Sequence, residues 1–144
     1  MADIVHEITI QAPAERVFDA IATQDGLTAW WTADTEADSR VGSTALFGFS
    51  KRALVFRMLI EALDRARRVV WRCSGDHPEW KDTRVTFDLR PAEEPGATTV
   101  RFVHGGWRST DGWLGPCSYT WAHILGRLKQ YAETGQRVPY FTGQ

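Results

Sequence analysis

Short segments between residues 34 and 104 alternate apolar and polar side chains, and this alternation restricts the fold more than any other feature of the chain. In the longest segment, 53–63, Phe56 and Met58 fall on one face while Glu61 falls on the other. Successive side chains of a β-strand point to opposite faces of its sheet. Segments with a single apolar face indicate an antiparallel sheet that is covered on one side only.

The same pattern predicts further strands at residues 4–10, 45–49, 69–73, 85–89 and 100–104. Residues 34–39 form a weaker segment in which Asp34, Glu36 and Asp38 share one face. Acidic side chains discourage pairing at the margin of a sheet, so this segment is expected to be an edge strand rather than a metal site.

Apolar residues at helical spacing indicate what covers the sheet. A short amphipathic helix is predicted from Pro13, in its first position, to about Ala22, and a second turn or two carries Trp30 and Trp31. The longest helical stripe consists of Leu114, Cys117, Trp121, Ile124, Leu125, Leu128 and Tyr131. We expect Asp111 to cap this helix, regular helix from Pro116 onward, and Gly135 at a left-handed C-terminal cap.

The composition limits the class of protein. The chain has 144 residues, of which 43% are hydrophobic, and Lys+Arg 17 balances Asp+Glu 18. This length predicts a single α+β domain spanning residues 1–144. Balanced charge predicts no nucleic-acid partner, and no apolar run approaches a membrane span, so the protein is not expected to be membrane-embedded. Two cysteines and no visible signal peptide predict a cytoplasmic location.

Two parts of the sequence resemble a known family. They are the run Ile8-Thr9-Ile10-Gln11-Ala12-Pro13-Ala14-Glu15-Arg16-Val17-Phe18-Asp19-Ala20-Ile21 with Gly26-Leu27 and Trp30-Trp31, and His104-Gly105-Gly106-Trp107 with Leu125-Gly126-Arg127-Leu128-Lys129-Gln130-Tyr131. Together they resemble the START-like (SRPBCC) superfamily, in the branch homologous to the activator of the HSP-90 ATPase. The resemblance implies a helix-grip fold, in which a curved antiparallel sheet of six or seven strands grips a long C-terminal helix and two short helices follow the first strand.

The resemblance also implies a cavity between the sheet and the long helix. The inward faces of the predicted elements then give the candidate ligand-binding residues, which are Trp31, Phe47, Phe49, Phe56, Met58, Trp71, Phe87, Phe102, His104, Trp107, Trp121, Leu125 and Leu128. The alternative is a filled core, because aromatic residues at these spacings usually pack against one another. Trp107 and Trp113 flank a polar loop and form either a lid over the cavity or a contact that fastens the loop.

His104 is the main polar candidate, because it shares the inward face of its strand with Phe102 and precedes two glycines. A neutral imidazole there can bind a ligand or act as a general base, while the alternative is a histidine satisfied by its own surroundings. His6 shares this parity in the first strand. We predict no metal, nucleotide or other cofactor, since no ligand spacing or glycine-rich motif occurs. Cys73 and Cys117 are expected to be buried, unreactive thiols.

Three functions remain open at this point. The first is binding of a small hydrophobic or amphipathic molecule in the cavity. The second is a cyclase- or aromatase-like enzyme that uses His104 as acid and base in the same cavity. The third is a co-chaperone-like interaction module with a chaperone partner. Val55, Leu59 and Val103 on the nominally outer face also allow a homodimer through the sheet.

Overall fold

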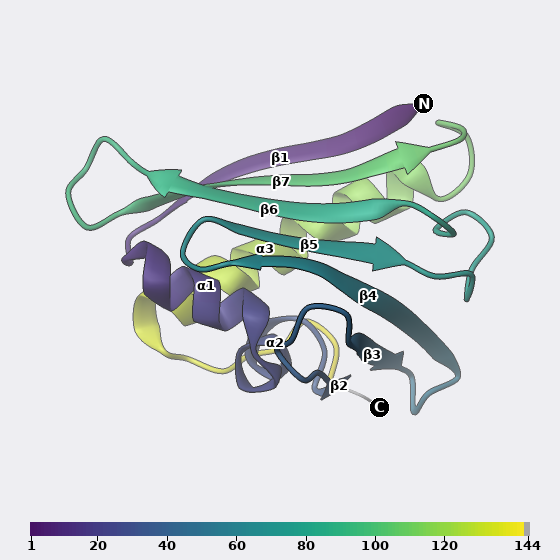
Figure 1. The fold of residues 1–144 in the computed structure, drawn as a ribbon, viewed down its shortest axis with the longest axis horizontal. Coiled ribbons are helices and arrows are strands. Elements are labelled where there is room, and N and C mark those ends of the chain that lie inside the picture. Colours follow the sequence, from purple (N-terminus) through teal and green to yellow (C-terminus); the bar gives the residue numbers. More distant parts are fainter. Residues whose placement is uncertain (143–144) are drawn as a thin grey trace.

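The computed structural model describes residues 1–142 and shows seven strands and three helices in this part of the chain (Figure 1). The elements, in chain order, are β1 (Ala2–Ile10), α1 (Ala14–Ala22), α2 (Gln24–Trp30), β2 (Asp34–Glu36), β3 (Thr44–Phe49), β4 (Leu54–Asp64), β5 (Arg68–Cys73), β6 (Arg84–Pro91), β7 (Thr98–Trp107) and α3 (Leu114–Thr134). No helix in the described residues is long and apolar enough to cross a membrane.

The strands form one antiparallel sheet in the order β1-β7-β6-β5-β4-β3-β2. Figure 1 looks onto this sheet, with α3 running behind it. The helices α1 and α2 pack against each other and against α3, and α1 also contacts β5 and β6. The predicted α+β class, the helix-grip architecture and the two short helices after the first strand are confirmed.

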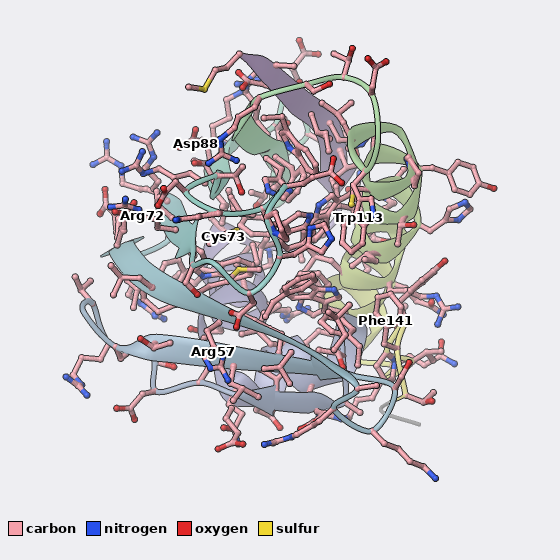
Figure 2. All side chains as sticks on the ribbon, turned by 90° about the vertical axis from the view of Figure 1, so that its right-hand side faces the viewer. Arg57, Arg72, Cys73, Asp88, Trp113 and Phe141 are labelled. Carbon is pink, nitrogen blue, oxygen red and sulfur yellow. The ribbon has the colours of Figure 1, made fainter. Side chains whose placement is uncertain are left out.

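Each central strand buries one face, as its alternation predicts. In β5, Val69 and Trp71 are buried while Arg68 and Arg72 lie outside. On the outer face, Arg68 forms an ion pair with Asp88 of the adjacent β6. Figure 2 shows Arg72 and Asp88 on this outer side, whereas Trp113 and Phe141 lie beside α3. The sheet therefore separates a charged, solvated face from an apolar face that holds the helices.

The acidic segment lies at the edge of the sheet, as expected. Asp34 pairs with Gly48 across β2 and β3, and its carboxylate accepts two hydrogen bonds of 2.9 Å from the Arg52 guanidinium. A Cβ atom at position 48 would lie 2.2 Å from Asp34 Oδ2, so a larger residue there would displace the Asp34 carboxylate from its place beside Arg52. Hydrogen bonding from Arg52 lowers the pKa of the Asp34 carboxyl.

The helix ends differ from their predictions in two places. Pro13 is the N-cap of α1 rather than its first residue. α3 begins at Leu114, before Pro116, and its N-cap is Trp113 without a side-chain cap, so Asp111 does not cap it. A proline in the first turn costs no helical hydrogen bond, and this explains how α3 can begin before Pro116. Gly135 does end α3 with a left-handed φ of 78°.

Candidate apolar ligand cavity

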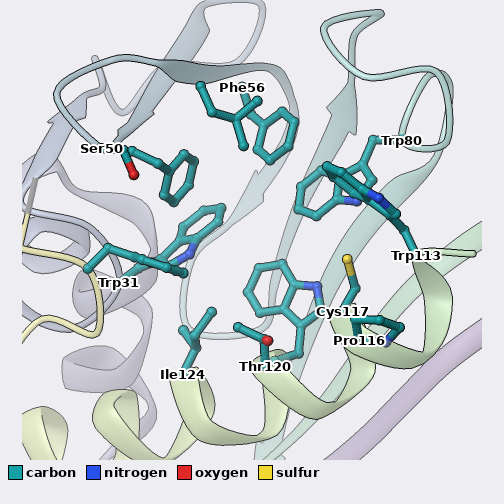
Figure 3. A pocket seen from close by; sticks show the side chains of 13 residues that line it. Trp31, Ser50, Phe56, Trp80, Trp113, Pro116, Cys117, Thr120 and Ile124 are labelled. Atoms are coloured by element: carbon teal, nitrogen blue, oxygen red, sulfur yellow. The ribbon is translucent and has the colours of Figure 1, made fainter.

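A cavity of about 390 Å³ opens beside the first half of α3 (Figure 3). Its other walls are the turn between β3 and β4 with the adjoining strand ends, and the loops that precede β6 and α3. Seven of its thirteen lining residues are aromatic, and none carries a charge. The lining consists of Trp31, Phe49, Ser50, Leu54, Phe56, Trp80, Trp113, Pro116, Cys117, Thr120, Trp121, Ile124 and Phe141. This volume lies within the range of about 300–1,000 Å³ that is typical of small-molecule sites.

A second depression, of about 430 Å³, lies beside α1 and the end of α3 and differs in chemistry. Charged side chains such as Arg16, Asp19 and Arg137 line it, and Arg137 forms an ion pair with Asp25. Charges that already pair with one another on a solvated surface need no ligand. The apolar cavity is therefore the stronger candidate site.

Periodicity explains how α3 contributes its part of the lining. The α3 residues of the lining are separated by alternating steps of one and three residues, which places them on one side of the helix: Pro116, Cys117, Thr120, Trp121 and Ile124. Trp121 and Ile124 are buried beneath the cavity, whereas Cys117 and Thr120 remain half-exposed along its wall. One face of the helix thus passes from core to cavity surface.

The C-terminal tail supplies another wall through backbone hydrogen bonds. The Phe141 N–H donates to the Trp31 carbonyl at 2.8 Å, and the Ala33 N–H donates to the Phe141 carbonyl at 3.0 Å. The Phe141 ring then packs edge-on against Phe49, with ring centroids 4.9 Å apart. The tail therefore carries an aromatic side chain across one end of the cavity.

Trp80 enters the cavity wall from the polar loop between β5 and β6. Its side chain is only 5% exposed and stacks on Phe56, with centroids 4.3 Å apart and an interplanar angle of 13°. Two hydrogen bonds of its backbone turn the loop inward. The backbone N–H of Trp80 donates to the His77 carbonyl at 3.0 Å, and the Thr83 hydroxyl donates to the Trp80 carbonyl at 2.6 Å. A large aromatic residue in an otherwise polar loop was the one sequence signal of this role.

His104 lies behind the cavity wall and does not line it. It is fully buried, and the indole N–H of Trp121 donates to its Nδ1 at 3.1 Å. Its Nε2 lies 2.9 Å from the Thr83 hydroxyl oxygen. Because that hydroxyl already donates to Trp80, its oxygen accepts from His104, which assigns the proton to Nε2. Burial lowers the pKa of His104 to about 3, so the ring is neutral near pH 7.

This network leaves His104 with no free lone pair and no free proton on its ring. The Trp80 ring packs edge-on against it, with centroids 4.6 Å apart. His6, the other histidine of the same parity, lies with its Nε2 3.1 Å from the Ser118 carbonyl oxygen of α3 and is likewise absent from the lining. The arrangement is suited to binding an apolar molecule rather than to transferring protons within the cavity.

Of the thirteen candidate residues, four line the cavity: Trp31, Phe49, Phe56 and Trp121. Nine others are buried elsewhere: Phe47, Met58, Trp71, Phe87, Phe102, His104, Trp107, Leu125 and Leu128. Their rings fill the space between the sheet and α3, since Trp71 lies 5.8 Å from Trp31 and 5.1 Å from Phe87 between centroids. Strand parity identified the apolar face of the sheet, but it did not distinguish the residues of that face that pack in the core from those that line the cavity.

The two tryptophans that flank the loop before α3 have different surroundings. Trp107 is buried, and its indole N–H donates to the His104 carbonyl at 3.0 Å. Trp113 lines the cavity and stacks on His77, with ring centroids 3.5 Å apart. Its backbone N–H donates a hydrogen bond to the Glu79 carboxylate at 3.0 Å. The loop before α3 is thus joined to the loop that carries Trp80.

The cavity offers little ionisable chemistry. Cys117 is its one titratable lining residue among those that the structure describes, and burial raises the pKa of its thiol. Cys73 is buried outside the cavity, and burial raises its thiol pKa to about 12. Within residues 1–142 no three His, Cys, Asp or Glu side chains are placed to hold a metal ion.

Comparisons with known proteins place this fold among solved structures. The solution structure of the Aha1 dimer from Colwellia psychrerythraea matches with a TM-score of 0.84 and 34% identity over 94% of this chain and 98% of that one. Crystal structures of proteins from Staphylococcus saprophyticus and Mesorhizobium loti match with TM-scores of 0.79 and 0.76. Their identities are 18% and 20%, over 99% and 90% of this chain and 100% and 95% of theirs, respectively.

No curated protein matches the chain. The sequence model of one protein family, however, covers residues 11–133, from the end of β1 to the last turn of α3. With the fold and the Colwellia psychrerythraea structure, this match confirms the resemblance found in the sequence. The chain belongs to the family described as activator of Hsp90 ATPase homolog 1-like proteins.

Proposed function

We propose that this protein binds a small, uncharged hydrophobic molecule in the cavity between β4, α3 and the loop that carries Trp80. The observation that carries this proposal is the lining itself, which is mostly aromatic and has no charged residue. Filling such a site removes apolar surface of both the protein and the ligand from water, and each Å² removed contributes a favourable free energy of about 25 cal/mol. An ionised ligand would lose its hydration without gaining a partner charge, so the preferred ligand is neutral.

The enzymatic alternative has less support than binding. His104, its proposed acid and base, already uses both ring nitrogens within the fold, and the rings of Trp80 and Trp121 pack against it. In this proposal His104 orients Trp121 and fixes Thr83, and it therefore shapes the cavity wall without touching the ligand.

The co-chaperone and homodimer alternatives need an exposed apolar surface. Of the three residues expected on the outer face, Leu59 is exposed, whereas Val55 and Val103 are half-buried. Val103 pairs with the exposed Val5 across β7 and β1, but β6 and β5 separate this pair from Leu59 and Val55 on β4. Leu59 pairs across β4 and β5 with Arg72 rather than with another apolar side chain. Apolar groups this small and this far apart are normal on protein surfaces and do not form an extended apolar patch, so ligand binding remains the better-supported function.

Two measurements test ligand binding. Native mass spectrometry of the purified protein looks for a co-purifying neutral molecule, and fluorescence titration uses the neutral probe N-phenyl-1-naphthylamine. We expect Thr120→Trp to fill the cavity and to weaken probe binding at least ten-fold. Tyr119→Trp introduces the same side chain at the neighbouring, exposed position of α3 and serves as the matched control. Equal affinity in both variants, or no binding to the wild type, would overturn the proposal.

A further inference from the structure

Trp80 carries a hydrogen-bond donor that the fold leaves unused. Among residues 1–142, its Nε1 is the one fully buried side-chain nitrogen or oxygen without a hydrogen-bond partner. Buried donors in folded proteins are nearly always paired, because burial removes the hydrogen bond to water without replacing it. An unpaired N–H in the wall of a candidate ligand site therefore requires an explanation.

Three other buried indoles of this chain find acceptors. Trp30 donates to the Ala20 carbonyl at 2.8 Å, and Trp107 and Trp121 donate to the carbonyl and to Nδ1 of His104. Trp80 is held as firmly as these residues, since its ring stacks on Phe56 and its backbone is fixed on both sides. Because Trp80 lines the cavity, its unpaired donor belongs to the cavity wall.

Cys117 is the group that faces this nitrogen. In Figure 3 the sulfur of Cys117 lies on the side of the cavity occupied by Trp80 and Trp113. Burial raises the pKa of the Cys117 thiol, and a weak interaction with the Trp80 indole N–H opposes this rise, but the two groups lack the geometry of a full hydrogen bond. A thiol is a weak acceptor on a short side chain. A change of the Cys117 χ1 rotamer would therefore let a stronger acceptor take the place of the thiol beside the indole N–H.

The cavity has three polar side chains besides the Trp80 indole: Cys117 and Thr120 come from α3, and Ser50 lies beside Phe49. Thr120 follows Cys117 by one turn of α3, and its hydroxyl has no hydrogen bond within the described residues. The opposite end is mostly apolar, since Phe49, Leu54 and Phe141 form it together with the single hydroxyl of Ser50. A ligand that fits both ends has a flat apolar body and a polar atom at one extremity.

We propose that the ligand is a neutral aromatic molecule with a terminal hydrogen-bond acceptor, such as an aromatic ketone, and that Trp80 Nε1–H donates to this acceptor. This inference rests on the proposed ligand-binding function and names the chemical class and the residue that selects it. Trp80 then contributes specificity as well as surface. A polar group of this kind discriminates by rejecting ligands that leave it unpaired.

Two probes of matched shape test the role of the N–H. 9-Fluorenone and fluorene share a flat tricyclic skeleton, but only fluorenone has a carbonyl oxygen. We expect the wild-type protein to bind fluorenone about five-fold more tightly, which is the effect of one net hydrogen bond on a dissociation constant. Trp80→Phe retains an aromatic ring without an N–H, and it should bind the two probes equally.

Control variants separate Trp80 from its neighbours. Trp113→Phe replaces another aromatic side chain of the cavity wall with a smaller one. It should weaken the binding of both probes while preserving the preference for fluorenone. Cys117→Ala and Thr120→Val remove the two polar groups that α3 contributes to the lining and should also preserve it. Loss of the preference in either of these two variants, or its persistence in Trp80→Phe, would overturn the assignment of Trp80 as the donor.

A measurement on the wild-type protein avoids any dependence on the folding of Trp80→Phe. The indole N–H signals are separate in a proton–nitrogen NMR spectrum, and fluorenone should shift that of Trp80 downfield whereas fluorene should not. If both probes bind with equal affinity and no such shift, this inference fails while ligand binding stands. If neither probe binds, the proposed function itself fails.

Discussion

The buried His104 predicts a marked loss of stability between pH 7 and pH 5. Its pKa is about 3 in the folded protein, where burial disfavours the charged ring, against an ordinary value of 6.5. Below pH 6.5 the unfolded chain therefore takes up a proton at this position while the folded protein does not. The folded state loses free energy relative to the unfolded state throughout that interval, from about pH 6.5 down to about pH 3.

The expected size follows from the proton uptake alone. Each pH unit between the two pKa values costs about 1.4 kcal/mol, so moving from pH 7 to pH 5 lowers the free energy of unfolding by about 2 kcal/mol. Carboxyl groups add little in this interval. Asp34, Asp82 and Glu133 have pKa values lowered below 3.8, 3.8 and 4.5 respectively, and they remain ionised at pH 5 in the folded protein.

Urea titrations at pH 7, 6 and 5, followed by tryptophan fluorescence, measure this loss. His104→Gln provides the comparison, because a neutral amide can still accept from Trp121 and donate to Thr83 but does not titrate. This variant should be less stable at pH 7 and should show almost no dependence on pH down to pH 5. His123→Gln, at an exposed position of α3, is the matched control and should retain the wild-type dependence.

Two outcomes would contradict the reasoning. If the wild-type free energy of unfolding were constant between pH 7 and pH 5, His104 would have an ordinary pKa or would reach solvent in the folded protein. If His104→Gln kept the full loss of about 2 kcal/mol, another group would be responsible. Either result would also remove the main argument against a proton-transfer role for this histidine.

Three further predictions concern packing and reactivity. Gly26→Ala places a Cβ atom 2.4 Å from a carbonyl oxygen of α1 and should cost about 1–3 kcal/mol in urea titrations, whereas Gly126→Ala, in open space on α3, should stabilise by about 0.5–1 kcal/mol. Thr83→Val leaves His104 Nε2–H unpaired and should cost about 1–3 kcal/mol by the same assay. Iodoacetamide should modify Cys117 more slowly than free cysteine at pH 7.5, as followed by mass spectrometry, because burial raises its thiol pKa.

The sheet and its covering helix were predictable because both depend on local periodicity. In β5, Arg68 and Arg72 mark the exposed face and so assign Val69 and Trp71 to the buried one. In α3, the spacing of Trp121, Leu125 and Leu128 indicates the buried stripe. These patterns follow from the geometry of an isolated strand or helix, so no knowledge of neighbouring elements is needed.

The cavity was not predictable in the same way, because it lies where local patterns end. Trp80 and Phe141 lie outside every periodic segment, and their places depend on turns and backbone hydrogen bonds that join distant parts of the chain. Phe87 and Phe102 satisfy the parity rule yet pack against each other in the core, with centroids 5.3 Å apart. Parity distinguishes the two faces of a strand but does not say which inward residues meet a cavity.

The position of Trp31 explains why the cavity is displaced from the centre of the fold. Its ring lies within 6.1 Å of those of Phe47, Phe49, Trp71 and Trp121, measured between centroids, and it fills the space between the sheet and α3 at that point. The open volume is left toward the first half of α3, where loops and the tail form its walls. Loops tolerate substitution better than a packed core does. The size and selectivity of this site are therefore expected to depend on Trp80, Trp113 and Phe141 more than on the sheet, and substitutions at these positions should change which ligands bind while leaving the fold intact.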